Sequence, residues 1–160
     1  MATENKNLSA YDLSALPDAR ELRIGLVVSE WNETITDALF RGAMNTLIDC
    51  GVHPDNITSW KVPGSFELPF GCRKMIGSFP LDAVIAIGSV IRGETSHFDF
   101  VCEAVAQGIK DLNVQTGTPV IFCVLTDDTM QQAQARSGGK HGNKGTEAAV
   151  AAIKMASLGR

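Results

Sequence analysis

The stretch AVIAIGSVI, residues 83–91, decides the fold class of this chain of 160 residues. Every residue in it is apolar except Gly88 and Ser89. A run of this kind is typical of a strand that is buried on both faces, as in a parallel sheet covered by helices on its two sides. The stretch therefore predicts a central strand of an α/β domain.

Strand-like and helix-like patterns alternate on both sides of this stretch. Further strands are predicted over Leu22–Val28, Ile57–Val62 and Val120–Leu125. Between them, apolar residues recur with the three- and four-residue spacing of amphipathic helices. The predicted helices run from about Asn32 to Gly51, Ser65 to Ile76, Phe98 to Leu112, Asp128 to Arg136 and Lys144 to Leu158. Because crossovers between parallel strands are right-handed, this order predicts a four-stranded parallel sheet with helices on both faces, a three-layer α/β/α sandwich.

The composition indicates one globular domain in the cytoplasm. Residues 1–20 are predicted as an N-terminal arm and residues 21–160 as a single domain. The net charge of -4 argues against a general nucleic-acid binder. The longest apolar run, Val120–Leu125, is too short to span a bilayer, and Met1–Asp18 lacks a signal-peptide core. The four cysteines are widely spaced and form no C-x-x-C pair, so free thiols in a reducing cytoplasm are expected.

Four loops are candidates for a binding site, because folds of this kind bind ligands at the carboxyl ends of their strands. They are residues 29–32, 63–67, 90–97 and 125–127. No G-x-G-x-x-G follows the first strand, and neither Lys140 nor Lys144 completes a Walker A pattern. A dinucleotide or nucleoside triphosphate enzyme is therefore disfavoured.

Two of these loops hold a residue with two possible interpretations. Trp31 is either partly buried or a flat platform for an aromatic ring, with Asn32 beside it as donor and acceptor. Asn32 is also a candidate N-cap of the first helix. Glu67 is either a helix-capping residue or an acceptor for ligand hydroxyls.

The segment RGETSHFD, residues 92–99, carries the densest set of reactive groups. Free N–H groups at a helix N-terminus bind phosphate, and a histidine such as His97 could move protons as a general acid and base. A lone loop histidine without function is the alternative. Arg136 suits bidentate phosphate binding but is also favoured at a helix C-terminus. Lys144 and Glu147 are three residues apart on a predicted helix, where a surface ion pair is the default.

No metal site is predicted, because the three histidines are far apart and have no carboxylate at ligand spacing. From the residues alone, we expect an α/β domain that binds a phosphorylated small molecule, with a ring stacked on Trp31.

Five motifs in register resemble the 6,7-dimethyl-8-ribityllumazine synthase family. They are IGLVVSEWN (24–32), VPGSFELP (62–69), IGSVIRGETSHFD (87–99), PVIFCVLT (119–126) and GNKG (142–145). The resemblance covers about residues 22–158 and implies a flavodoxin-like fold. It also implies an enzyme of riboflavin biosynthesis that needs no cofactor or metal. That enzyme condenses 5-amino-6-(D-ribitylamino)uracil with 3,4-dihydroxy-2-butanone 4-phosphate, and releases the lumazine, phosphate and water.

The resemblance implies roles for residues in the candidate loops. Trp31 would stack on the pyrimidine ring with Asn32 beside it, although Trp31 stands where Phe or Tyr is often seen. His97 matches the proton-transfer histidine. The ribityl chain and ring edge would be bound by Ser65, Phe66 and Glu67, with Ser65 acting through its backbone. The ring would meet the backbone of Val90 and Ile91, and the phosphate-side loop would be Gly93, Glu94 and Thr95.

The same resemblance implies a homopentamer with shared active sites. Phe122 and Arg136 match residues lent by the adjacent subunit, with Arg136 holding phosphate, and Lys144 and Glu147 match a supporting polar pair. The loop 137–142 is short, which in the family goes with capsids of sixty subunits, so a capsid of twelve pentamers is the hypothesis. The N-terminal arm is expected to pack on a neighbouring subunit as an extra strand, and an association with riboflavin synthase is a further hypothesis.

Two other functions stay open. A lumazine-using riboflavin synthase of the pentameric kind would share the lumazine but consume it. A non-catalytic flavin or lumazine binder, or a shell protein, could keep Trp31 while losing turnover. The presence of both His97 and Arg136 argues against such a binder.

Overall fold

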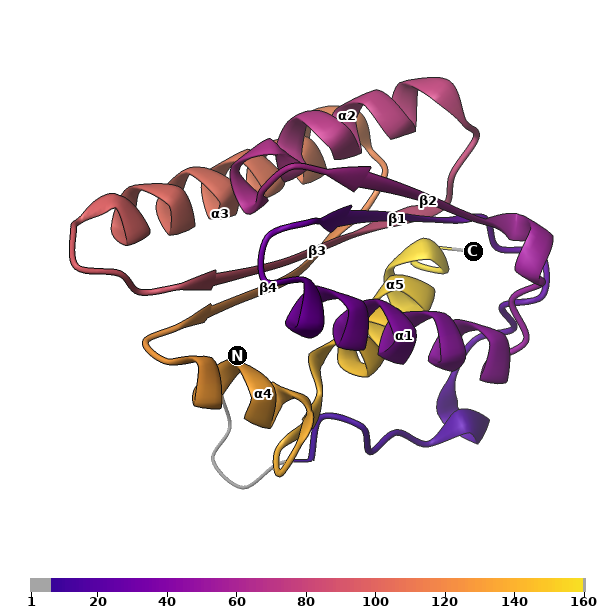
Figure 1. Ribbon diagram of the computed structural model, residues 1–160. Coiled ribbons are helices and arrows are strands. Elements are labelled where there is room, and N and C mark those ends of the chain that lie inside the picture. Colours follow the sequence, from indigo (N-terminus) through magenta and orange to yellow (C-terminus); the bar gives the residue numbers. More distant parts are fainter. Residues whose placement is uncertain (1–6, 160) are drawn as a thin grey trace.

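A four-stranded parallel sheet lies between two layers of helices (Figure 1). The computed structural model describes residues 7–159. The strands are β1 (Ile24–Ser29), β2 (Ile57–Val62), β3 (Ala83–Ile91) and β4 (Val120–Asp127), in the order β2-β1-β3-β4. This is the order of the first four strands of a flavodoxin-like sheet, so the predicted fold class is confirmed.

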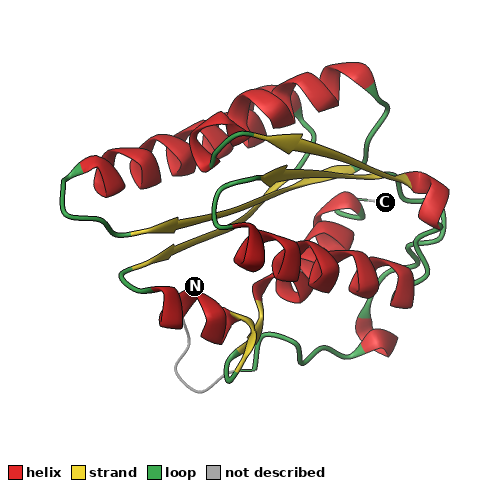
Figure 2. Ribbon diagram, viewed as in Figure 1, coloured by secondary structure: helices red, strands yellow, loops and turns green. Residues whose placement is uncertain are grey.

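The helices divide into two layers, one on each face of the sheet (Figure 2). One layer contains α2 (Leu68–Ser78) and α3 (His97–Thr116). The other contains α1 (Glu33–Asp49), α4 (Met130–Arg136) and α5 (Lys144–Ala156). Short 3-10 turns cover Leu13–Ala15, Pro54–Asn56 and Ser65–Glu67, and a small hairpin is formed by β5 (Ser137–Gly139) and β6 (Gly142–Asn143).

Strand β3 is buried on both faces, as its apolar run predicts. Alternate residues point to opposite sides of a strand, so β3 serves two separate cores. Ile85 and Ile87 belong to the core under α1 and α5, whereas Val84 and Ala86 belong to the core under α2 and α3. The sheet is thus sandwiched, and its functional surface is left at the ends of the strands.

The boundaries differ from the predicted ones at several points. The first strand begins at Ile24 and not at Leu22, because the Leu22 N–H donates to the Ala19 carbonyl (3.1 Å) in a turn. Helix α3 begins at His97 and continues to Thr116, where Gly117 ends it with φ +70°. Strand β4 continues two residues further, to Asp127, and the hairpin within Ser137–Asn143 was not predicted.

The described part of the predicted N-terminal arm lies along its own chain. The Leu8 N–H donates to the His141 carbonyl (3.0 Å), and the Asn143 N–H donates to Ser9 Oγ (3.0 Å). The arm therefore borders the β5–β6 hairpin. Its first six residues lie outside the described residues, and its packing on a neighbouring subunit stays a prediction.

All four cysteines are free, as expected. Burial raises the pKa of the Cys72 and Cys123 thiols to about 12. These two are therefore unreactive core residues. Among residues 7–159, none of the helices combines the length and the apolar character that crossing a membrane requires.

Candidate active site

A cleft of about 680 Å³ opens at the carboxyl ends of β1, β2 and β3. We call it the Trp31 cleft. Its walls come from the segments that follow β1 and β2, from the end of β3 and from the first turns of α3. The lining residues are Trp31, Asn32, Gly64, Ser65, Phe66, Glu67, Ser89, Val90, Ile91, His97, Phe100 and Val101. Eight of them were predicted as site residues: the rule for parallel sheets indicated their loops, and the family resemblance implied the roles of the single residues.

Asn32 holds the loop between β1 and α1 in an unusual conformation. Its backbone is left-handed, with φ 59°, which asparagine tolerates better than most residues. The Asn32 side chain makes no capping bond, so that part of the N-cap prediction is wrong. Its Nδ2 instead donates to the Ser89 carbonyl (2.9 Å), across the sheet on β3. The amide thus ties the loop to the floor of the cleft.

This tether leaves the neighbouring Trp31 ring in the open. The Trp31 side chain is 73% exposed, so the interpretation that it is partly buried is wrong for the single chain. Its backbone N–H donates to the Pro63 carbonyl (3.3 Å), which joins this loop to the one after β2. An indole fixed at its backbone and free on its face suits ring stacking.

Glu67 comes into the same cleft from the loop after β2. It stands at the N-cap position of α2, yet its side chain makes no capping hydrogen bond. A Cβ added to Gly64 would be 3.0 Å from Glu67 Oε2 and 3.6 Å from Trp31 Cδ1. The carboxylate and the indole therefore approach each other over Gly64. Since no cap uses it, the carboxylate is available to accept from hydroxyl groups.

Two buried hydroxyls lie behind this wall. Ser29 and Ser65 each have an Oγ with no hydrogen-bond partner among residues 7–159. A Cβ on Gly88 would be 2.6 Å from Ser65 Oγ and 3.4 Å from Ser29 Oγ. Gly88 therefore leaves the room these hydroxyls occupy. Ser29 belongs to the candidate loop 29–32 predicted from the sequence, but no role was assigned to it there.

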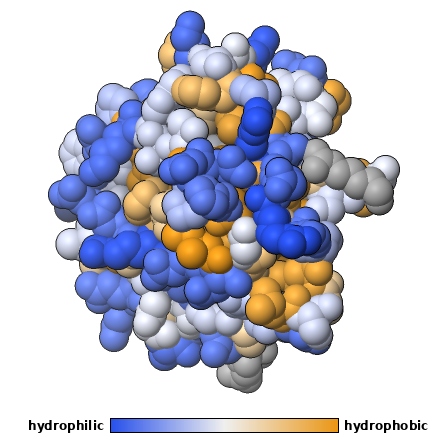
Figure 3. Space-filling model, turned by 90° about the vertical axis from the view of Figure 1, so that its right-hand side faces the viewer, coloured by the Kyte–Doolittle hydropathy of each residue, from blue (hydrophilic) through white to orange (hydrophobic). Residues whose placement is uncertain are grey.

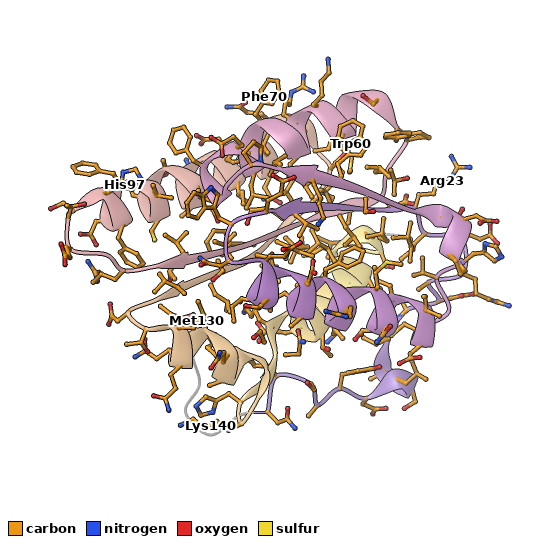
Figure 4. The ribbon with its side chains drawn as sticks, in the orientation of Figure 1. Arg23, Trp60, Phe70, His97, Met130 and Lys140 are labelled. Atoms are coloured by element: carbon orange, nitrogen blue, oxygen red, sulfur yellow. The ribbon has the colours of Figure 1, made fainter. Side chains whose placement is uncertain are left out.

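His97 is the first residue of α3 and is exposed at the rim of the cleft (Figure 4). The backbone N–H of His97 donates a long hydrogen bond to Thr95 Oγ1 (3.4 Å). Phe100 follows three residues later on the same helix face and was missed, although that spacing was readable in the sequence. The predicted phosphate-side residues Gly93, Glu94 and Thr95 lie next to the cleft in the chain, but none of them lines it.

Arg136 lies elsewhere, in a second hollow of about 540 Å³ that we call the Arg136 cavity. Its lining includes Asp127, Lys140 and His141, together with three glutamines of α4. Figure 4 shows His97 on one layer of the molecule and Lys140 on the other. Within a single chain the predicted proton carrier and the predicted phosphate ligand are therefore not brought together.

The Arg136 cavity also contains the buried carboxylate of Asp127. Asp127 is 7% exposed, and its Oδ2 has no hydrogen-bond partner among the described residues. Desolvation raises the pKa of this carboxyl, and the nearby Arg136 charge works in the opposite direction. With Arg136, Lys140 and His141 around one acid, the cavity is suited to an anion.

Phe122 and Lys144, two further predicted site residues, line neither the Trp31 cleft nor the Arg136 cavity. Phe122 is 36% exposed on β4. Lys144 pairs with Glu147 as predicted, but its side chain is largely buried, so this is not the surface pair that was the default. Among residues 7–159, no three His, Cys, Asp or Glu side chains are grouped so that they could hold a metal ion.

The fold and the cleft define the class. This is a doubly wound α/β protein with an open cleft at the carboxyl ends of its parallel strands, where such folds bind small molecules. Residues 21–160 match the sequence profile of the family described as 6,7-dimethyl-8-ribityllumazine synthase. The chain belongs to the 6,7-dimethyl-8-ribityllumazine synthase family.

Similar proteins agree over nearly the whole length. The 6,7-dimethyl-8-ribityllumazine synthase of Christiangramia forsetii is 65% identical over 99% of this chain and 95% of its own. That of Flavobacterium johnsoniae is 66% identical over 98% of this chain and 82% of its own. That of Porphyromonas gingivalis is 55% identical over 100% of this chain and 99% of its own. The expected family and enzyme class are thereby confirmed, and the related riboflavin synthase is disfavoured.

Proposed function

We propose that the Trp31 cleft condenses 5-amino-6-(D-ribitylamino)uracil with 3,4-dihydroxy-2-butanone 4-phosphate to give 6,7-dimethyl-8-ribityllumazine, phosphate and water. The observation that carries this proposal is the meeting of three groups in one cleft. They are an exposed indole, a carboxylate that makes no capping bond and an exposed imidazole, from the segments that follow three different strands. They match the three needs of the reaction, which are a ring platform, a hydroxyl acceptor and a proton carrier.

The uracil substrate lies against Trp31. The indole face stacks on the pyrimidine, and the backbone of Val90 and Ile91 contacts the ring edge. The ribityl hydroxyls donate to the Glu67 carboxylate and lie along Ser65 and Phe66. Asn32 contributes indirectly, since its bond to the Ser89 carbonyl fixes the Trp31 loop.

His97 moves the protons of the condensation. The uracil amine attacks the ketone, the carbinolamine loses water to give an imine, and phosphate leaves by elimination to give an enol that becomes a second ketone. The ribitylamino nitrogen then attacks this ketone, and loss of a second water closes the ring. A neutral imidazole at the rim accepts a proton at one step and returns it at another. Holding the two reactants side by side supplies much of the remaining acceleration.

A second subunit completes the site. No cation lines the Trp31 cleft, apart from His97 when it is protonated, yet the second substrate carries a phosphate. Arg136 of an adjacent subunit fills this need and holds the phosphate together with the N–H groups of Gly93–Thr95, and Phe122 of that subunit borders the site. Lys144 and Glu147 support them as a polar pair. The family's members form oligomers, and a homopentamer supplies one such neighbour to every cleft.

The outer assembly extends this arrangement. The connection between α4 and α5 contains only the tight β5–β6 hairpin, which suits a capsid of twelve pentamers. Strand β2 is at the edge of the sheet and can accept the N-terminal arm of a neighbour as an added strand. We place this assembly in the cytoplasm and expect it to associate with riboflavin synthase.

Turnover tests the proton carrier. With both substrates and no added metal, lumazine absorbance should rise well above the spontaneous rate. His97→Ala should lower kcat by about 100-fold with little change in KM for the uracil. His53→Asn is the matched control, because His53 is exposed, lies outside the cleft and caps a turn that Asn also caps. Unchanged kcat in His97→Ala would remove His97 from the chemistry, and a background rate in the wild type would favour the non-catalytic binder.

Complementation tests the shared site. His97→Ala and Arg136→Ala should each be nearly inactive alone. Oligomers mixed from the two variants contain some interfaces with an intact His97 on one side and an intact Arg136 on the other. Mixed oligomers should therefore regain a substantial part of the activity. No recovery in mixtures that do exchange subunits would show that both residues act within one chain.

A further inference from the structure

Arg92 has no role in the proposed mechanism, yet it connects several elements near the Trp31 cleft. It directly follows β3 and precedes the loop that leads to His97. Its Nε donates to Asp128 Oδ1 (2.8 Å), and its two terminal nitrogens reach Asp99 Oδ1 (3.0 Å) and Oδ2 (3.3 Å). Its guanidinium carbon lies 4.1 Å from the centre of the Phe98 ring. One side chain thus holds the start of α3 and the end of the β4 region together.

The backbone of Arg92 strengthens this connection. Its N–H donates to the Asp127 carbonyl (2.9 Å), which continues the pairing of β3 with β4 past the last strand residue. The carboxylate of Asp128, the next residue, accepts the hydrogen bond from Arg92 Nε. Arg92 is therefore fixed to the end of β4 at two points, and its guanidinium has a defined origin from which to hold α3.

The loop between Arg92 and α3 has few other anchors. Residues 93–97 are all exposed. Ser96 is the N-cap residue of α3, but its side chain makes no capping bond. The long bond from the His97 N–H to Thr95 Oγ1 lies within the loop itself. The first turn of α3 is instead tied to the sheet by buried Phe98 and by Asp99, and Arg92 contacts both.

The chemistry of arginine suits this task. A planar guanidinium donates two parallel bonds to one carboxylate, which fixes direction as well as distance. Asp99 accepts one hydrogen bond from Nη1 and forms an ion pair with Nη2 through its other oxygen, while Asp128 accepts from Nε. Exposed ion pairs contribute little to overall stability, and Arg92 is 42% exposed. We therefore expect Arg92 to fix the position of the loop 93–97 and to contribute little to the stability of the domain.

We propose that Arg92 is a positioning residue that fixes the loop 93–97 and, through it, the imidazole of His97 and the N–H groups of Gly93–Thr95. This inference rests on the function proposed above for the Trp31 cleft. Arg92 touches no substrate. It acts by holding the first turn of α3 against the carboxyl end of β4.

Arg92→Gln tests the proposal in the assembled enzyme. We expect kcat to fall by about tenfold, because small displacements of a catalytic group are costly to the rate. KM for the uracil should stay within about twofold, since Trp31 is untouched, and Tm should change by no more than about 2 °C. Backbone amides of residues 93–97 should exchange with deuterium faster. Arg92→Lys, which keeps the charge but loses the planar fork, should recover only part of kcat.

Arg20→Gln is the matched control, because Arg20 also pairs with an aspartate, Asp18, but far from the cleft in the arm. It should leave kcat and exchange in the loop unchanged. Asp128→Asn provides a double-mutant cycle with Arg92→Gln. If Arg92 acts through its pair with Asp128, Asp128→Asn should lower kcat by less in the Arg92→Gln variant than in the wild-type protein.

Three results would overturn the proposal. The first is unchanged deuterium exchange of residues 93–97 in Arg92→Gln. The second is an Arg92→Lys variant with full kcat. The third is a large fall of Tm that accompanies the loss of kcat in Arg92→Gln, which would indicate a general loss of structure. The exchange readout does not depend on catalysis. It therefore still decides the role of Arg92 if His97→Ala shows that the imidazole is not the proton carrier.

Discussion

Asp127 is a residue whose environment opposes its charge. It ends β4 with a buried carboxylate, whose Oδ2 has no partner among residues 7–159. Burial raises the pKa of this carboxyl. An acid with a raised pKa in the folded state destabilises that state once it is ionised. Its favourable contribution is present below the usual pKa of aspartate and is lost as the pH rises through the folded-state value.

Asp127→Asn should therefore stabilise the protein at neutral pH. We expect a gain of about 1 kcal/mol in the free energy of unfolding at pH 7, and no gain near pH 3.5, where the wild-type carboxyl is protonated as well. Thermal unfolding of both proteins across this range checks it. Asp55→Asn is the control, since that carboxylate is 91% exposed. A gain of the same size at every pH would exclude charge as the cause.

The residues of the candidate site were predictable to different degrees. Trp31, Glu67 and His97 lie in the segments that follow β1, β2 and β3, so the rule for parallel sheets indicated that they meet, while their roles were implied by the family resemblance. The closeness of the Ser29 and Ser65 hydroxyls was not predictable, because it depends on Gly88, which leaves the space beside both of them. The environment of Asp127 depends likewise on how α4 covers the end of β4.

Helices α1 and α5 approach each other closely at one glycine. A Cβ on Gly145 would overlap the Leu39 carbonyl oxygen of α1, which belongs to rigid helix backbone. Gly145→Ala should therefore push the two helices apart, at a cost of about 3 kcal/mol in the free energy of unfolding. Thermal unfolding measures this. Gly93→Ala is the control, because a Cβ there meets nothing within 4 Å. Equal Tm values for the two variants would contradict the close packing.

At the level of elements, patterns that depend on burial predicted more than patterns that depend on local turns. The run at residues 83–91 predicted β3 with its observed bounds, since both of its faces must be apolar. The β5–β6 hairpin was missed, because it has only five residues in its two strands and no alternating pattern. It is held partly by the distant Leu8 and Ser9, which local sequence cannot reveal.

At the scale of the molecule, large aromatic side chains are exposed on the layer of α2 and α3. Phe66, Phe70 and Phe100 are 60%, 74% and 71% exposed. The face at the amino ends of the strands shows separate apolar patches among hydrophilic residues (Figure 3). Clustered exposed aromatics usually mark a contact surface with another chain, in line with the proposed oligomer.

Phe70→Lys should therefore weaken assembly. Phe70 lies beside Arg73 and Lys74, so a further cation adds repulsion as well as removing an apolar contact. Native mass by light scattering should shift toward smaller species, while circular dichroism stays that of the folded chain. Phe70→Leu, which keeps the position apolar, should assemble more fully. An unchanged mass in Phe70→Lys would show that this ring is not at an interface.

The exposed position of Trp31 gives the protein an optical reporter of its own. The chain has two tryptophans, and they differ sharply in surroundings. Trp60 is half-buried and meets the Phe79 ring edge-on at 5.7 Å, whereas Trp31 stands in solvent at the mouth of the cleft. Iodide in solution can therefore collide with one indole and hardly with the other. The red-shifted, quenchable part of the intrinsic emission belongs to Trp31, and any ring that stacks on it changes that part alone.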